Sequence, residues 1–176
     1  MLKIAALVIV VLLVAVLVVA ATRPDTFQVQ RSASIKAPPE KIYALINDFR
    51  HWGSWSPYEK KDPAMKRTLS GAESGKGAVY QWDGNNQVGS GRMEIAEASP
   101  ARQITIKLDF IRPFEGHNIA EFVIAPRDDH STQVTWAMHG PSPYVAKLMG
   151  LFFNMDTMIG RDFEDGLSNL KALAEG

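Results

Sequence analysis

The clearest hydrophobic pattern of the chain runs through residues 143–175, near its C-terminal end. Apolar residues recur there at steps of three or four positions, the spacing that stacks side chains on one face of an α-helix. The apolar stripe consists of Leu148, Phe152, Met155, Ile159, Phe163, Leu167, Leu170 and Ala174. The spacing predicts a single long helix, around which we expect the other elements to be arranged.

Two glycines lie inside this predicted helix, although a glycine costs a helix about 1 kcal/mol relative to alanine. Gly160 directly follows Ile159 of the apolar stripe, and Gly166 lies farther along. Three interpretations of Gly160 are open: a close approach of the sheet, a bend in the helix, or contact with a ligand. We expect any ligand contacts of the helix to lie between Met155 and Phe163.

Most of the chain between residues 27 and 139 alternates apolar and polar positions, the pattern of half-buried β-strands. In residues 103–110, for example, isoleucine, leucine and phenylalanine alternate with polar side chains. Strands are predicted over residues 27–35, 65–69, 78–82, 87–96, 103–110, 116–125 and 132–139. Gly89 and Gly91 interrupt the fourth strand and indicate a bulge or a bend, which a curved sheet needs.

A short helix is predicted after the first strand, because Pro38 and Pro39 fit the first turn of a helix. The order of elements is then strand, short helix, about six further strands joined by short turns, and the long helix. Runs of strands beside segregated helices are typical of the α+β class, in which helices cover one face of an antiparallel sheet. The pattern therefore predicts an α+β domain.

The stretch 48–58 combines two tryptophans with Gly53 and Pro57 and has no clean period, so an irregular connection is predicted. Its aromatic side chains either fold back as a lid over the core, or place Trp52 and Trp55 at the rim of a ligand cavity. Other aromatic and methionine residues are expected to converge on the same interior. They are Tyr80, Trp82, Phe110, Phe122, Trp136 and Met138 from the sheet, and Phe152, Met155, Ile159 and Phe163 from the helix. The sequence does not separate a packed core from an open cavity.

Residues 4–21 form an unbroken apolar run with no charge. A helix of this length spans about 27 Å, close to the roughly 30 Å hydrocarbon core of a bilayer. The run predicts an uncleaved membrane anchor, with a cleaved signal sequence as the alternative because small residues end it. Lys3 precedes the run and favours a cytoplasmic N-terminus and an exported domain. The expected organisation is an anchor over residues 1–22, a spacer over 23–26 and a folded domain over 27–176.

Charge and composition narrow the chemistry further. The 19 basic and 19 acidic residues balance, which gives no indication of nucleic-acid binding, and the chain has no cysteine. No close-spaced histidine pair suggests a metal site, and neither a cofactor motif nor a catalytic acid and base pair stands out. The polar side chains that we consider for a cavity are His117, Asp156 and Arg161, although an exposed position is the simpler interpretation for each.

The order of elements and several local segments resemble the START/Bet v 1-like superfamily, in particular the bacterial polyketide cyclase/dehydrase-like branch. The similarity covers roughly residues 27–174. The segments that carry it are Ile35-Lys-Ala-Pro-Pro-Glu-Lys-Ile-Tyr43, residues 48–57, Gly75-Lys-Gly-Ala-Val-Tyr-Gln-Trp82, Thr132-Gln-Val-Thr-Trp136 and Phe163-Glu-Asp-Gly-Leu-Ser-Asn-Leu-Lys171. The resemblance implies a helix-grip fold, in which a seven-stranded curved antiparallel sheet wraps around the C-terminal helix. It also implies a cavity that commonly holds hydrophobic small molecules or lipids.

Three functions follow as hypotheses, because this fold does not fix an activity. The first is a membrane-anchored protein that binds a hydrophobic small molecule or lipid between the sheet and the C-terminal helix, without catalytic residues, metal or cofactor. The second is an enzyme of the polyketide cyclase or dehydrase type. The third is a stress-response or interaction domain with no small ligand.

Overall fold

Seven antiparallel strands form one curved sheet in the computed structural model, which describes residues 2–176. The strand order across the sheet is β1-β7-β6-β5-β4-β3-β2, so strands β2 to β7 follow one another as neighbours and β1 closes the far edge. The strands are β1 (Thr26–Ile35), β2 (Lys66–Gly71), β3 (Ala78–Asp83), β4 (Ser90–Ser99), β5 (Gln103–Arg112), β6 (Gly116–Pro126) and β7 (Thr132–Pro141). The predicted α+β class and the seven-stranded sheet are confirmed.

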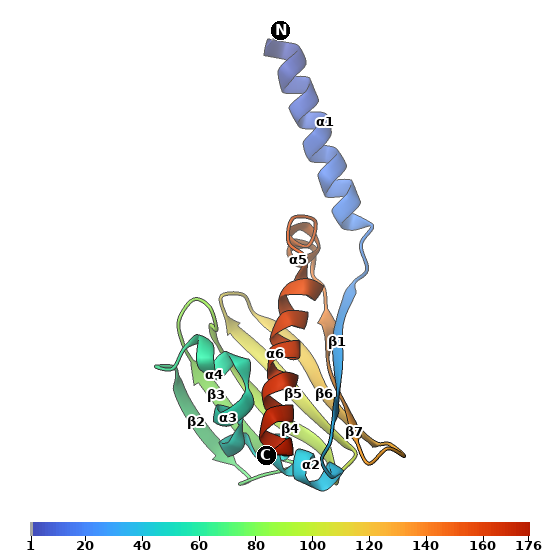
Figure 1. The fold of residues 1–176 in the computed structure, drawn as a ribbon. Helices are drawn as coiled ribbons and strands as arrows, with labels where there is room; N and C mark the ends of the chain where they lie inside the picture. Colours follow the sequence, from blue (N-terminus) through green and yellow to red (C-terminus); the bar gives the residue numbers. More distant parts are fainter. Residues whose placement is uncertain (1) are drawn as a thin grey trace.

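The C-terminal helix α6 (Met155–Glu175) lies across the concave face of this sheet (Figure 1). Its buried side chains include Phe163, Leu167 and Leu170, which are members of the predicted apolar stripe. Four shorter helices connect β1 to β2 and lie on the same face of the sheet as α6 (Figure 1). They are α2 (Pro39–Asn47), the 3-10 helix η1 (Phe49–His51), α3 (Trp52–Trp55) and α4 (Pro57–Lys61). This arrangement is the predicted helix-grip fold.

The prediction of one continuous helix over residues 143–175 is wrong, because the chain forms α5 (Tyr144–Met149) and α6 with a turn between them. Glycine at position 150 favours an end of α5. Asn154 begins α6, since its side-chain oxygen accepts a hydrogen bond from the backbone N–H of Thr157 at 3.0 Å. The break turns the first part of the stripe outward, so that Phe152 is 69% exposed and Met155 is 46% exposed.

The sheet bends at β4, where the register against β5 shifts between Ser90 and Gly91 and again between Ile95 and Glu97. Gly91 is required because a side chain there would collide with the indole of Trp82 on the neighbouring strand. Gly89 has a φ of 63° and belongs to the turn before β4 rather than to the strand. The bend predicted from these glycines is confirmed, while β4 starts later and ends later than the predicted residues 87–96.

Helix α1 (Leu2–Ala21) extends away from the domain (Figure 1). Residues Lys3–Ala21 are long and apolar enough to cross a membrane, which fits a membrane anchor or a signal sequence. The end of α1 contacts α5. Among the side chains that the structure describes, none from α1 belongs to the hydrophobic core cluster of the domain. The domain core is therefore complete without α1.

Candidate functional site

Aromatic rings fill the middle of the space between the sheet and α6. The ring of Phe163 on α6 stacks on the indole of Trp136 on β7, with centroids 4.1 Å apart, and Phe122 on β6 stacks on the same indole, with centroids 4.9 Å apart. Trp55 meets both Phe122 and Trp136 edge-on, at 6.0 and 5.8 Å. Because these rings are buried and in mutual contact, this part of the predicted cavity is a packed core.

The tryptophans of residues 48–58 belong to this packed core, and the stretch folds into short helices rather than the predicted irregular loop. Trp52 and Trp55 are buried, and their indole N–H groups donate to the backbone carbonyls of Ile46 at 2.9 Å and Leu45 at 3.1 Å. The interpretation of a lid folded over the core is therefore correct. The expectation that these two tryptophans lie at the rim of a cavity is wrong.

Two further predicted lining residues, Tyr80 and Met138, are also buried in the core cluster. One polar group in the core lacks a partner, because the indole N–H of Trp136 makes no hydrogen bond. The same indole packs so closely on α6 that a Cβ at Gly166 would lie 2.7 Å from it and 3.0 Å from Pro57. Gly166 is thus a packing requirement of the helix against the sheet.

Several apolar side chains at the end of the concave face nearest α5 are half-buried, and we call this group the open-end residues. The group comprises Trp82, Met93, Leu108, Phe110 and Ile159, each of which packs on the core cluster or on another member. Trp82 meets Phe110 edge-on, with ring centroids 5.8 Å apart, and its indole N–H donates to the carbonyl of Val88 at 3.0 Å. The core therefore ends in an apolar surface that solvent reaches.

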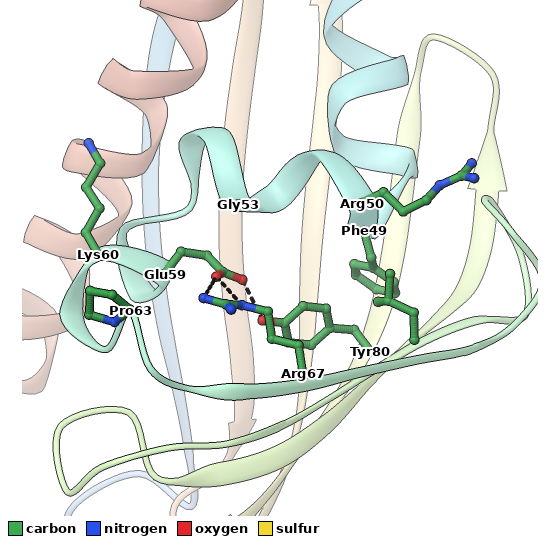
Figure 2. Close-up of a pocket in the computed structure, with 9 residues that line it drawn as sticks. Phe49, Arg50, Gly53, Glu59, Lys60, Pro63, Arg67 and Tyr80 are labelled. Atoms are coloured by element: carbon green, nitrogen blue, oxygen red, sulfur yellow. Dashed lines mark hydrogen bonds and ion pairs between the residues drawn. The ribbon is translucent and has the colours of Figure 1, made fainter.

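A separate open pocket of about 420 Å³ lies between the helices α3 and α4 and the strands β2 and β3 (Figure 2). Its lining residues include Phe49, Glu59, Arg67 and Tyr80, whereas the long side chains of Arg50 and Lys60 point away from it (Figure 2). Of this set, only Tyr80 was among the residues predicted for a site.

Glu59 is the centre of the polar wall of this pocket. Its two carboxylate oxygens accept hydrogen bonds from Tyr80 Oη at 2.5 Å and from Arg67 Nε at 2.5 Å. Burial and the hydrogen bond to Glu59 raise the pKa of the Tyr80 phenol above its ordinary range. Burial lowers the pKa of the Arg67 guanidinium, but its hydrogen bond and ion pair with Glu59 outweigh that effect and raise it. Each oxygen accepts a hydrogen bond from a strand of the sheet, so the group holds α4 against β2 and β3.

Sequence reasoning missed Glu59 and Arg67. Glu59 stands beside two lysines, a context that ordinarily indicates a solvated turn, and no local pattern marks its burial. Only the tertiary contact between α4 and the edge of the sheet brings Arg67 and Tyr80 to it.

The three polar side chains considered for a cavity lie at the surface, so the exposed interpretation of each is correct and the cavity alternative is wrong. The His117 side chain is 72% exposed and hydrogen-bonds Asp109 at 2.7 Å, a contact that raises the pKa of the imidazole. Asp156 is an exposed partner of Arg31, at 3.0 Å. Arg161 is exposed on the outer side of α6. Within residues 2–176, no group of three or more histidine or acidic side chains is placed to hold a metal ion.

The position of the Arg31 side chain explains why residue 160 is a glycine. The Arg31 side chain rises from β1 to α6, where it donates to Asp156 and to Glu164 at 2.7 Å. A Cβ at Gly160 would collide with the Arg31 guanidinium. Of the three interpretations of this glycine, the close approach of the sheet is the correct one.

Comparison with known proteins places this geometry in a family. The family model described as "Polyketide cyclase / dehydrase and lipid transport" matches residues 26–175. No curated protein sequence matches the chain at a significant level of similarity.

Solved structures share the fold at low sequence identity. A protein from Chromobacterium violaceum is 16% identical with a TM-score of 0.61, over 88% of this chain and 99% of that one. A protein from Nitrosospira multiformis is 17% identical with a TM-score of 0.61, over 84% and 96%. Aha1 from Colwellia psychrerythraea, solved as a dimer, is 16% identical with a TM-score of 0.55, over 85% and 96%. These likenesses show the fold, and the family match over residues 26–175 shows that the chain belongs to the polyketide cyclase/dehydrase and lipid transport family.

Proposed function

We propose that this protein is a membrane-anchored binding protein for a hydrophobic small molecule or lipid. The family to which it belongs supports a ligand-binding domain. The observation that carries the finer proposal is the set of open-end residues, because apolar side chains left half-buried beside a complete core are the usual lining of an apolar ligand site.

The packed aromatic core determines where such a ligand would lie. Phe122, Trp136 and Phe163 occupy the deep part of the helix grip, so the ligand would contact Trp82, Phe110 and Ile159 at the end nearest α5. A shallow site of this kind suits one acyl chain or one flat ring system better than a fully enclosed lipid.

The anchor hypothesis supplies a source for the ligand. A helix with the composition of residues Lys3–Ala21 would hold the open end near a bilayer, and the lysine before it favours an exported domain. The proposed localisation is therefore a single-pass membrane protein with its domain on the exported side.

Two other functions are weighed against this proposal. A cyclase or dehydrase would draw support from the family description, but the buried carboxylate of Glu59 already has both oxygens in hydrogen bonds. An interaction domain without a small ligand would draw support from the filled interior. We place the binding protein first because the half-buried apolar side chains gather on the concave face beside α6, and ligand sites are usually concave and apolar.

Adjacent residues of β5 provide a matched test. Phe110 lies on the same face of β5 as the buried Ile106 and is half-buried, whereas Ile111, at the register shift between β4 and β5, is 62% exposed. We would titrate the protein with a dansyl-labelled fatty acid and follow energy transfer from tryptophan. We expect saturable binding that Phe110→Ser weakens at least tenfold and Ile111→Ser leaves within about twofold. Absence of saturable binding, or equal effects of the two substitutions, would refute the proposal.

A further inference from the structure

We infer that α5 and the turn after it form a second membrane contact, an interfacial surface that lies in the bilayer headgroup region beside α1. The inference rests on the proposed function, since it takes α1 to be a membrane anchor. We call this the docking surface, and it consists of Val145, Met149, Phe152, Phe153, Met155 and Met158. These side chains are between 38% and 69% exposed.

The docking surface carries no unpaired charge. Residues 141–158 contain only two charged side chains, Lys147 and Asp156. The ammonium of Lys147 pairs with Asp25, just after α1, at 2.5 Å, and Asp156 pairs with Arg31 at 3.0 Å. A contiguous apolar surface without free charge is rare on a soluble monomer and usually marks an interaction site.

A hydrogen bond fixes the depth of this surface relative to α1. Tyr144, the first residue of α5, donates its hydroxyl to the backbone carbonyl of Leu17 at 2.9 Å. Leu17 precedes the end of the span at Ala21 by four residues, or about 6 Å at the rise of an α-helix. If α1 spans the bilayer, α5 begins within the membrane border, where amphipathic helices lie about 5–10 Å deep and tyrosine is enriched.

The bilayer is the occupant that this geometry favours over a second copy of the chain. Helix α5 contacts α1 and lies beside the segment that joins α1 to β1 (Figure 1), so the same membrane would meet both. The strand directions place Trp82 and Phe110 toward this same end of the domain. Docking would therefore hold the open-end residues against the membrane, so that a lipid could pass between bilayer and protein without crossing water.

The absence of cysteine makes a direct test possible. We would place single cysteines at Val10, Phe153 or Ala172 in the full-length protein and label each with the fluorophore NBD. The proteins are reconstituted into phosphatidylcholine/phosphatidylglycerol nanodiscs with doxyl-labelled lipid as quencher. Val10 reports the middle of α1, Phe153 reports the docking surface, and Ala172 is an exposed control on the last turns of α6.

We expect strong quenching at positions 10 and 153 and little at 172. Quenching at position 10 with none at 153 would overturn the docking surface while leaving the anchor intact. No quenching at position 10 would refute the anchor itself, and with it the premise of this inference. Efficient disulfide cross-linking between Phe153→Cys chains, without quenching at 153, would assign the surface to a second copy and also overturn the inference.

Discussion

The indole of Trp136 and the ring of Phe163 lie face to face, with centroids 4.1 Å apart and planes 10° from parallel. Trp136 comes from β7 and Phe163 from α6, so this contact joins the sheet to the helix that it grips. It also occupies the space where a deep ligand cavity would otherwise be. The stack therefore contributes to the stability of the domain. It also restricts the proposed site to a shallow position.

Phe163→Ala should destabilise the domain by about 3–5 kcal/mol, because it removes a buried ring and leaves a cavity beside Trp136. Urea unfolding followed by tryptophan fluorescence measures the loss. Phe153→Ala is the matched control, since that ring is exposed and its removal should change stability by about 0.5 kcal/mol or less. Equal losses for the two variants would contradict the packed core.

The two glycines of α6 should respond oppositely to alanine. At Gly166 a new Cβ meets the rigid rings of Trp136 and Pro57, so Gly166→Ala should cost about 1–3 kcal/mol despite the better helix propensity of alanine. At Gly160 the new Cβ meets the flexible end of Arg31. The loss of an exposed ion pair and a gain of about 1 kcal/mol in helix propensity should then nearly cancel.

Thermal unfolding of both alanine variants measures this difference. We expect a clearly lower midpoint for Gly166→Ala and a midpoint near that of the wild type for Gly160→Ala. A reversed order would mean that α6 packs on the sheet in another register.

The pair between the buried Glu59 carboxylate and the partly exposed Arg67 guanidinium predicts a second contrast. Arg67→Met leaves the Glu59 carboxylate, whose side chain is 7% exposed, without its cation, which should cost about 3 kcal/mol. Tyr80→Phe removes one hydrogen bond from the same carboxylate and should cost about 1 kcal/mol.

Arg112→Met provides the control for this contrast, because it breaks an exposed pair with Asp83 and should cost about 1 kcal/mol or less. Chemical denaturation at neutral pH compares the three variants. A loss at Arg67 no greater than that at Arg112 would show that the Glu59 network contributes nothing beyond a surface ion pair.

The ion pair of Asp156 with Arg31 should make part of the stability of the domain depend on pH. The hydrogen bond from Arg31 lowers the pKa of the Asp156 carboxyl below its ordinary value of 3.8. When the pKa of a carboxyl group is lower in the folded than in the unfolded state, the group stabilises the fold at pH values above its unfolded-state pKa. This contribution is lost as the pH falls through the folded-state pKa. The wild type should therefore be more stable than Asp156→Asn above roughly pH 4 and approach it at lower pH.

Urea midpoints measured at neutral pH and down to about pH 2.5 test this dependence. Asp165→Asn, on an exposed position of the same helix, serves as the comparison and should show no such convergence. A constant difference between wild type and Asp156→Asn at every pH would contradict the role of the ion pair.

Periodicity predicted the sheet and the buried half of α6, because alternate positions in strands and the stripe from Phe163 to Ala174 respond directly to one large apolar core. The same periodicity did not reveal the break before Met155, because apolar spacing continues across it. The end of α5 and the Asn154 cap depend on local backbone hydrogen bonds, which apolar spacing does not report. The composition of residues 48–58 indicated a lid but not its short helices.

The candidate site was less predictable than the fold. Whether Trp136 and Phe110 line a cavity or fill it depends on which rings meet across the sheet, and residues distant in sequence decide this. Burial of Glu59 likewise depends on β2 and β3. The exposed position of His117, by contrast, agrees with the alternation along β6, in which Phe122 and Ile124 occupy the core-facing positions.

Native mass spectrometry of the protein purified from the cells that naturally produce it tests the central claim most directly. Because the core of residues 27–176 contains no described side chain of α1, the domain separated from α1 can be analysed. We predict an adduct with the mass of a lipid or another apolar molecule, retained by Ile111→Ser and lost from Phe110→Ser. An adduct-free wild-type protein, or an adduct that Phe110→Ser retains, would contradict ligand binding at the open-end residues.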